Sequence, residues 1–216
     1  MLILHDYFRS SACYRVRIAM QLKELNYQLI PIHLVNNGGE QFSADYLKIN
    51  PHSLVPTLTH DNKTITQSLA IIEYLDETFP TSPLLPKDPY LKSLVRAFSL
   101  SIAADLHPLN NLRVLSYLTN QLKITEEQKN IWYQHWMTKG LTGLEKQLAA
   151  LNTTTPFCFG DKPTMADICL VPQMYNARRF ACDLTNYPAL VRIDQNCRQL
   201  PAFQAASPEQ VKEEIL

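Results

Sequence analysis

The stretch FPTSPLLPKDP, residues 79–89, divides this sequence into two halves with different patterns. It holds four prolines, and a segment so rich in proline acts as a semi-rigid connector between domains. Before it, short apolar runs alternate with helical spacings, and after it only helical spacings occur. We therefore predict one domain over residues 1–80, a linker over 81–89 and an all-helical domain over 90–216.

The half before the linker has the pattern of an α/β domain. Leu2–Leu4 is a short apolar run that suits a buried strand, and apolar residues at the spacing of one helix face follow it. Pro31 indicates a strand at a sheet edge, because proline cannot donate a ladder hydrogen bond. The segments predicted after the first helix are a strand at 27–33, a weak helix at 41–48, strands at 55–59 and 64–65, and a helix at 67–79.

The half after the linker is predicted to be all-helical. A long amphipathic helix begins near Leu91 and is expected to kink at Pro108, and a second one covers residues 137–151. Thr164 and Asp167 stand three residues apart before an apolar run, which is the spacing of a capping box at a helix start.

Composition places the chain among ordinary globular proteins. Of its 216 residues, 46% are hydrophobic and 19% charged, and the formal net charge is +0. A neutral chain offers no electrostatic footprint for nucleic acid or an acidic membrane. The start MLILHDYFRS lacks the basic and long apolar regions of a signal peptide, and no run approaches the roughly 18 apolar residues of a membrane span. We expect no nucleic-acid partner, no export and no membrane anchoring.

The five cysteines have no metal-like or disulfide-like spacing. Their number is odd, and none stands in a CxxC pair. We expect reduced thiols in a cytoplasmic protein and no metal site. The cysteines lie at positions 13, 158, 169, 182 and 197.

The first chemically suggestive motif is SSACYRVRIA, which starts at Ser10, where a strand gives way to a helix. Serine is a preferred N-cap, so a purely structural role for Ser10 and Ser11 is one interpretation. The other is an anion site, because a helix N-terminus carries about half a positive charge. That potential favours a thiolate, either of Cys13 or of a bound thiol ligand.

Two further motifs could bind a peptide-like ligand. If the bond between Val55 and Pro56 is cis, the peptide groups of Val55 point outward and can pair with another backbone as an added strand. Gln67 and Ser68 then open a helix, which Ser68 is expected to cap. Its hydroxyl and the exposed amides there can hold a carboxylate.

In combination, these motifs resemble the zeta-class glutathione transferases, the class that includes the maleylacetoacetate isomerases. The pair SSxxxRVRIA and QSLAIIEYL is highly specific, whereas VPTL and the capping box occur in many glutathione transferases. The resemblance spans nearly the whole chain. It implies an α/β plus all-α protein with the glutathione transferase fold, in which a thioredoxin-like domain binds glutathione and a helical domain completes the substrate pocket. It also implies a homodimer.

The resemblance carries residue roles onto this sequence. Ser10 donates to the glutathione thiolate, with Ser11 beside it, and these are the implied catalytic positions. The other implied cofactor contacts are Arg15, Gln41, Val55, Gln67, Ser68, His107 and Asn111. The implied contacts to substrate carboxylates are Arg9, Arg113 and Arg179.

Two positions depart from the family pattern. His107 stands where the family often has glutamine. Ala12 stands where many zeta members have cysteine, and Cys13 follows one place later. One step along a helix rotates a side chain by about 100°, so we expect Cys13 to face away from the site.

The activity implied is the glutathione-dependent cis–trans isomerisation of 4-maleylacetoacetate, a dicarboxylate, to 4-fumarylacetoacetate in tyrosine and phenylalanine catabolism, with a glutathione transferase side activity. Three alternatives remain. One is isomerisation of maleylpyruvate, and another is conjugation or dehalogenation of small α-halo acids. The third is a catalytically silent glutathione-binding protein, since a fold does not guarantee a function.

Overall fold

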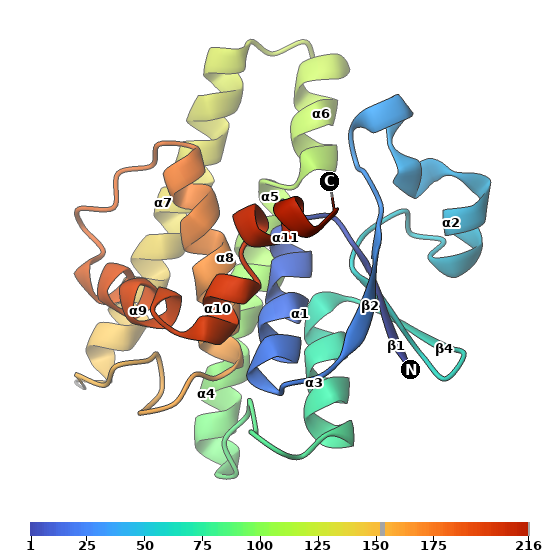
Figure 1. The fold of residues 1–216 in the computed structure, drawn as a ribbon. Helices are drawn as coiled ribbons and strands as arrows, with labels where there is room; N and C mark the ends of the chain where they lie inside the picture. Colours follow the sequence, from blue (N-terminus) through green and yellow to red (C-terminus); the bar gives the residue numbers. More distant parts are fainter. Residues whose placement is uncertain (152–153, 216) are drawn as a thin grey trace. The chain divides into compact units, whose positions relative to one another are not determined.

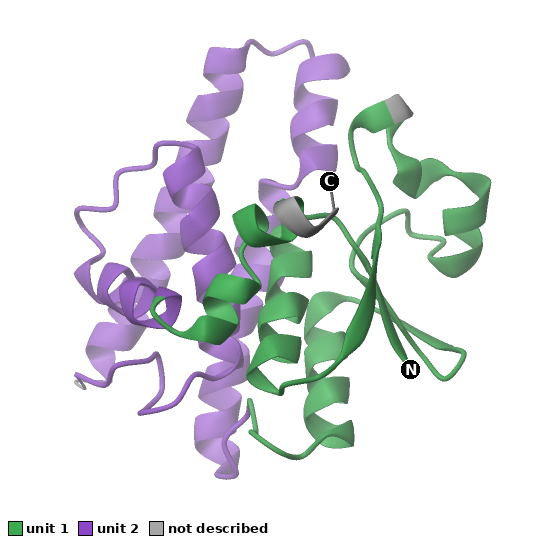
Figure 2. Ribbon diagram, in the orientation of Figure 1, with its two compact units in different colours: residues 1–84, 199–216 green, residues 85–198 purple. Residues whose placement is uncertain are grey.

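The computed structural model describes residues 1–151 and 154–215, apart from the side chains of Asn37 and of residues 213–215. The chain forms two compact units (Figure 2). One unit combines residues 1–84 with residues 199–216, and the other contains residues 85–198. The first is an α/β unit and the second is helical, as predicted.

The first unit is built on a four-stranded mixed sheet with the order β2-β1-β3-β4 (Figure 1). The strands are β1 Leu2–Asp6, β2 Tyr27–Pro31, β3 Thr57–His60 and β4 Lys63–Thr66. β1 pairs with β2 in parallel and with β3 antiparallel, and β3 pairs antiparallel with β4. The strand that contains Pro31 lies at an edge, which confirms the prediction.

Two helices pack against this sheet through one apolar core. α1 (Ser11–Leu22) contributes Val16 and Met20 to that core, and α3 (Ser68–Thr78) contributes Ile71 and Leu75. The predicted weak helix is a 3-10 turn, η2 (Glu40–Phe42), followed by α2 (Ala44–Ile49), and another 3-10 turn, η1 (Asn36–Gly38), precedes them. The unit ends with α10 (Pro201–Ala205) and α11 (Pro208–Ile215).

The chain's last segment differs from the domain boundaries drawn from the sequence. Those boundaries put residues 199–216 in the helical domain, whereas the structure groups them with the sheet. Two buried donors on α1 explain the grouping: Tyr14 Oη donates to the carbonyl of Phe203 at 3.3 Å, and Arg17 Nε donates to that of Ala206 at 3.0 Å. Buried donors need acceptors, and the C-terminal backbone supplies them.

The regular secondary structure described in the second unit is helical, apart from an isolated β-bridge between Phe157 and Gly160. A capping box between Thr125 and Gln128 caps the N-terminus of its longest described helix, α7. The predicted capping box between Thr164 and Asp167 opens α8. The helical segments are α4 Pro89–Leu100, η3 Ser101–Leu106, α5 His107–Leu109, α6 Leu112–Asn120, α7 Glu126–Ala150, α8 Met165–Arg179 and α9 Pro188–Arg198.

The helix expected to kink at Pro108 departs from α-helical geometry earlier than predicted. η3, Ser101–Leu106, is a π-helical segment between α4 and α5. Pro108 has no N–H to donate to the carbonyl four residues before it, so the turn that leads into it cannot complete the α pattern. Across the described chain, no helix combines the length and the apolar character that crossing a membrane requires.

Candidate active site

The strand register brings the loops that carry the predicted cofactor contacts to one end of the sheet. The residues paired at that end are Asp6 with Pro31, His5 with Thr57, and Thr57 with Thr66. The segments after β1, after β2, before β3 and after β4 therefore start from neighbouring positions. Ser10, Gln41, Val55 and Gln67 belong to these four segments.

Ser10 is the N-cap of α1. Its backbone is extended, and its Oγ accepts a hydrogen bond from the Cys13 N–H at 3.3 Å. Ser11 is the buried first residue of the helix, and the first turn contains no acidic residue that would offset the positive helix end. The capping role is thus confirmed. Because the capping bond uses only the oxygen, the Ser10 O–H can still donate to a bound anion.

Cys13 points into the core instead. Its side chain is fully buried, and its Sγ accepts a hydrogen bond from the Tyr7 N–H at 3.4 Å. Burial, reinforced by the charge of Asp6, raises the pKa of this thiol far above its usual value. Cys13 is therefore a neutral thiol. None of the five cysteines forms a disulfide, and the described residues contain no cluster of ligating side chains that could hold a metal ion.

The start of α3 corrects one expectation. Gln67, not Ser68, occupies the N-cap position, and with a φ of 70° it makes no side-chain capping bond. Ser68 lies inside the first turn, where its buried Oγ accepts a hydrogen bond from Arg15 Nη1 at 3.2 Å. The Arg15 side chain is only 1% exposed. A helix N-terminus without a side-chain cap thus adjoins a buried guanidinium, and both favour an anion.

The peptide bond between Val55 and Pro56 is cis. The preceding turn is fixed because the carbonyl of Leu54 accepts two hydrogen bonds, each 2.7 Å long, from Tyr46 Oη and Asn50 Nδ2. The ladder between β1 and β3 ends at Thr57, two residues after Val55. The backbone of Val55 therefore lies beyond the ladder at the site end of the sheet.

Gln41 has an unused acceptor. Its side chain is buried, and its Nε2 donates to the Leu34 carbonyl at 3.4 Å. Its Oε1 has no hydrogen-bond partner within the described residues. Gly39, at a φ of 103°, lies so close that a Cβ there would stand 2.6 Å from Gln41 Nε2. The loop backbone thus approaches the amide closely and leaves one buried acceptor for a ligand N–H.

The helical unit holds two of the predicted cofactor contacts together. Asn111 caps α6 by accepting from the Arg113 N–H at 3.1 Å, and its Nδ2 lies 3.5 Å from His107 Nε2. Arg113, in the first turn of α6, is exposed.

The remaining two arginines are also exposed. Arg179, at the end of α8, lies over the Phe180 ring at 5.2 Å, and Arg9, in the first unit, lies over the Phe8 ring at 4.9 Å. Arg178, by contrast, pairs with Asp194 at 2.7 Å, whereas Arg179 makes no ion pair among the described side chains. Arg178 is therefore held in a structural ion pair, whereas Arg179 forms no such pair with the described side chains.

Sequence reasoning missed a cavity of about 210 Å³ in the first unit, at the turn between β1 and α1. Residues 6–9 line it together with residues 31–33, Asn36 and Lys212. His33 carried no functional signal, because it was predicted as the last residue of the strand at 27–33, which ends at Pro31 in the structure. Lys212 carried none, because an exposed lysine in a charged terminal helix is typical of any surface.

The fold and the loops at this end of the sheet define the class of protein. Residues 4–83 match the sequence family described as glutathione S-transferase, N-terminal domain, and residues 108–205 match its C-terminal domain. The chain belongs to the glutathione S-transferase family.

Particular relatives narrow the comparison. A Vibrio cholerae protein named "Probable maleylacetoacetate isomerase" is 49% identical over 96% of each chain. A solved maleylpyruvate isomerase, described as a bacterial glutathione S-transferase of the zeta class, superposes with a TM-score of 0.93 at 38% identity, over 96% of this chain and 97% of that one. A maleylacetoacetate isomerase from Anaeromyxobacter dehalogenans, with dicarboxyethyl glutathione and citrate in its active site, has a TM-score of 0.85 at 38% identity, over 97% and 95%.

Proposed function

We propose that this protein is a glutathione-dependent isomerase that converts 4-maleylacetoacetate to 4-fumarylacetoacetate in tyrosine and phenylalanine catabolism. The observation that carries the proposal is the placement of two helix N-termini at one end of the sheet. One bears the Ser10 hydroxyl, and the other adjoins the buried Arg15. The relatives support the substrate class. Two of those described are named maleylacetoacetate isomerase or probable maleylacetoacetate isomerase, and one binds a glutathione derivative with two added carboxylates.

The residues at that end fit glutathione. The start of α3, with Ser68 and Arg15, suits the α-carboxylate of the γ-glutamyl residue. The Val55 backbone suits the cysteinyl peptide as an added strand. Gln41, whose Oε1 lacks a partner in the described part of the chain, suits the glycyl peptide. The glutathione sulfur would then lie at Ser10, and these residues all fall in the predicted domain over residues 1–80.

His107 and Asn111, both in the helical unit, are proposed as further contacts to the cofactor. Their side chains lie within 3.5 Å of each other, so they can act on one ligand group. Ser11, the buried first residue of α1, is proposed to act beside Ser10 at the cofactor sulfur.

In the proposed mechanism the protein stabilises the sulfur anion of glutathione and binds the carboxylates of the substrate. When bound, glutathione supplies a sulfur nucleophile that adds reversibly to the conjugated double bond, which permits rotation before the sulfur leaves. Ser10 and the N-terminus of α1 stabilise the sulfur as an anion. Arg9, Arg113 and Arg179 hold the substrate carboxylates, because a guanidinium binds a carboxylate through two parallel hydrogen bonds.

One experiment tests the proposal directly. Purified protein is mixed with glutathione and 4-maleylacetoacetate, and loss of the cis isomer is followed. The expected result is a rate that requires glutathione and leaves its concentration unchanged. Retention on immobilised glutathione without any turnover would instead favour a silent binding protein.

Maleylpyruvate is the second candidate substrate, because the zeta-class structure with a TM-score of 0.93 carries that name. The two substrates differ in length, so the comparison of kcat/KM on both separates them. The same assay with a small α-halo acid measures the conjugation and dehalogenation alternative.

We also propose that the protein is a cytoplasmic homodimer. Five cysteines without a disulfide suit a reducing compartment. Tyr90 and Leu100 on α4 are 72% and 49% exposed, which suits a surface that a second copy covers. Light scattering on the eluting protein is expected to give twice the 24.7 kDa of one chain.

A further inference from the structure

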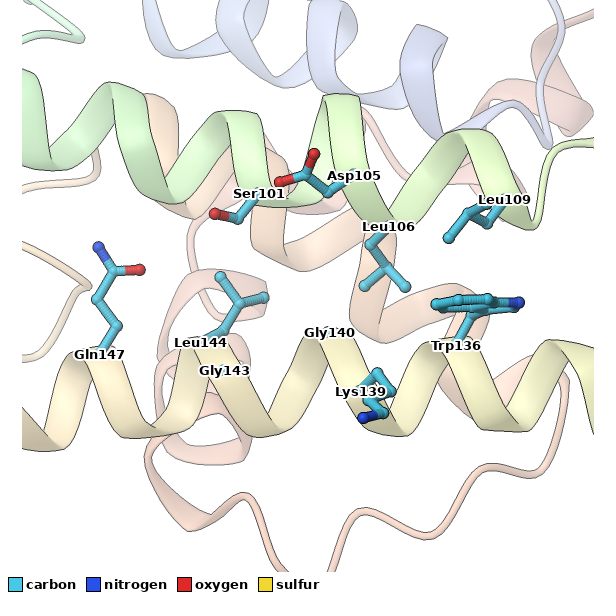
Figure 3. Close-up of a pocket in the computed structure, with 10 residues that line it drawn as sticks. All are labelled: Ser101, Asp105, Leu106, Leu109, Trp136, Lys139, Gly140, Gly143, Leu144 and Gln147. Carbon is cyan, nitrogen blue, oxygen red and sulfur yellow. The ribbon is translucent and has the colours of Figure 1, made fainter.

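Two cavities of the described structure differ in the charges that line them. The larger, about 380 Å³, lies in the helical unit, where Asp105 and Lys139 supply one charge of each sign (Figure 3). The smaller, about 210 Å³, lies in the first unit and is lined by two cationic residues, Arg9 and Lys212. The smaller cavity is therefore the one that favours an anion.

The two cations of the smaller cavity have no counter-ion among the described residues. Neither Arg9 nor Lys212 forms an ion pair with a described side chain. Asp6 also lines the cavity, but its carboxylate is fully buried and pairs with Arg17 at 2.6 Å. Val211, 1% exposed, anchors α11 in the first unit, and Lys212 follows it at the cavity. An anion that enters the cavity thus meets two unpaired positive charges.

The walls of the smaller cavity strengthen this attraction. Phe8, Pro31 and Ile32 supply apolar lining. Charges interact more strongly beside apolar walls than in open water, because the effective dielectric constant is lower there. The Arg9 guanidinium lies over the Phe8 ring at 4.9 Å, a contact that orients its plane and leaves its N–H edge for a carboxylate.

His33 adds a neutral donor to the lining. Its Nδ1 accepts a hydrogen bond from the Asn36 N–H at 2.9 Å, so the proton of the neutral ring is on Nε2. Glu40 accepts from the His33 backbone N–H at 2.6 Å, but it does not line the cavity. The described lining thus combines charged and neutral donors without an exposed carboxylate.

The smaller cavity adjoins the proposed position of the glutathione sulfur. Arg9 directly precedes Ser10, and the Ser10 N–H donates to the Tyr7 carbonyl at 2.8 Å, which closes the turn that lines the cavity. Sites for whole small molecules usually measure about 300–1,000 Å³. A cavity of about 210 Å³ therefore suits one arm of a ligand whose reacting carbon lies at Ser10.

We propose that Lys212 is a specificity-determining residue of the isomerase, and that with Arg9 it holds the substrate carboxylate far from the double bond. The inference rests on the proposed function. The other carboxylate is bonded to the carbon that reacts with the sulfur and so stays near Ser10, whereas the far one needs a separate site.

The test compares the diacid with maleylacetone, which is the same molecule with hydrogen in place of the far carboxylate. Glutathione-dependent turnover of both is measured on the full chain. Lys212→Met keeps an unbranched side chain without the charge, and it is expected to lower kcat/KM for 4-maleylacetoacetate about tenfold, the effect of one lost charge-assisted hydrogen bond. It is expected to leave kcat/KM for maleylacetone unchanged, because that substrate has no group for Lys212 to bind.

Two further variants are the controls. Lys63→Met alters an exposed lysine of β4 outside the cavity, and it is expected to leave both values unchanged. Lys212→Arg keeps the charge and is expected to retain most of the activity on the diacid. Unchanged turnover of the diacid by Lys212→Met overturns the proposal, as does an equal loss on both substrates, which would indicate a structural role.

A binding measurement separates this proposal from the proposed function. Calorimetry measures the affinity of suberate, an unreactive saturated diacid of the same chain length, for the glutathione complex. Lys212→Met is expected to weaken this binding severalfold. Absence of turnover by the unaltered protein would refute the isomerase function, whereas suberate binding that is absent, or that Lys212→Met leaves intact, would refute the role of Lys212.

Discussion

In the proposed mechanism the Ser10 hydroxyl both caps α1 and stabilises the sulfur anion, and a second serine in the same unit allows these two roles to be separated. Ser43 caps α2 by accepting from the Tyr46 N–H at 3.2 Å, much as Ser10 caps α1 at 3.3 Å. Replacing either serine by alanine is expected to lower the free energy of unfolding by about 1 kcal/mol, the usual value of an N-cap. Only Ser10→Ala is expected to reduce turnover, by roughly 100-fold, the effect of one lost donor to a developing anion.

The measurements are urea unfolding and glutathione-dependent isomerisation of the two variants. Equal turnover in Ser10→Ala and Ser43→Ala would mean that the Ser10 hydroxyl is only a cap. Cys13→Ala is a further comparison, and it is expected to retain far more activity than Ser10→Ala, since the Cys13 sulfur is buried in the core.

Burial of His5 is expected to make the free energy of unfolding depend on pH. Its ring lies on β1 at 6% exposure, and burial lowers its pKa from the usual 6.5, although a hydrogen bond to the Thr57 backbone partly opposes the shift. The unfolded chain therefore binds the proton more readily than the folded one. Stability is expected to be fully present above pH 6.5 and to decrease as the pH falls below that value.

The check is the urea midpoint at pH 7.5 and at pH 5.5. His5→Phe is expected to lose more of this pH dependence than His52→Gln, which alters an exposed histidine in the same unit. If both variants keep the decrease seen in the unaltered protein, another group is responsible.

At the scale of a single element, two glycines of α7 are expected to respond in opposite ways to replacement by alanine. Gly143→Ala is expected to raise the free energy of unfolding by about 1 kcal/mol, because alanine is the better helix former and its Cβ meets open space. Gly140→Ala places its Cβ against the buried Leu106, and overpacking of about 1–3 kcal/mol outweighs the gain in helix propensity.

Urea denaturation of the two variants measures these effects. A higher midpoint for Gly143→Ala and a lower one for Gly140→Ala are expected, with the unaltered protein between them. Matching shifts of both midpoints in one direction would contradict the close contact between Leu106 and α7.

Local signals in the sequence predicted most elements well. The edge strand was indicated by Pro31, and the start of α8 by Thr164 and Asp167, because each feature acts through its own neighbours in the chain. The start of α3 was misread, since the left-handed Gln67 breaks the usual cap and the Ser68 hydroxyl is engaged by Arg15, 53 residues away. Distant partners of this kind leave no local pattern.

At the scale of the whole molecule, the chain's end completes the unit in which the chain begins. Arg17 is fully buried, forms an ion pair with Asp6 at 2.6 Å, and donates to the Ala206 carbonyl at 3.0 Å. Burial raises the pKa of the Asp6 carboxyl, and the Arg17 charge partly offsets that rise. The ion pair between Arg17 and Asp6 is buried, and the chain's end helps to satisfy it. Breaking a buried ion pair costs about 3–5 kcal/mol, so loss of that end is expected to be costly.

A chain that ends at Arg198 tests this dependence. It loses the acceptors of Tyr14 and Arg17 and the buried Phe203, whose truncation alone would cost about 3–5 kcal/mol. Amide hydrogens of α1 are expected to exchange much faster than in the full chain. A chain that ends at Lys212 keeps these contacts and serves as the control, so equal protection of α1 in both shortened chains would contradict the role of residues 199–206.

The return of the chain's end to the first unit is the part of the fold that the sequence did not predict. The prediction of an all-helical domain over 90–216 includes the last residues, and these do form helices, but it assigned them to the wrong unit, because no local pattern shows which partner a terminal helix packs against. The proline-rich linker indicated a division near residue 84. It carried no sign that the chain returns to the first unit after residue 198. The proposed cofactor residues rest on motifs, whereas Lys212, which lines the cavity of about 210 Å³ in the first unit, belongs to no motif.

The contact between Arg17 and Ala206 also sets the timing of folding during synthesis. The two residues are 189 positions apart, so at about 5–20 residues per second the ribosome needs roughly 10–40 s to make the second after the first. Throughout that interval two donors of the nascent helix α1, on Tyr14 and Arg17, lack the acceptors of Phe203 and Ala206. A chain released early by a stalled ribosome is consequently left with an incomplete first unit, because the acceptors of Tyr14 and Arg17 are among the last residues made.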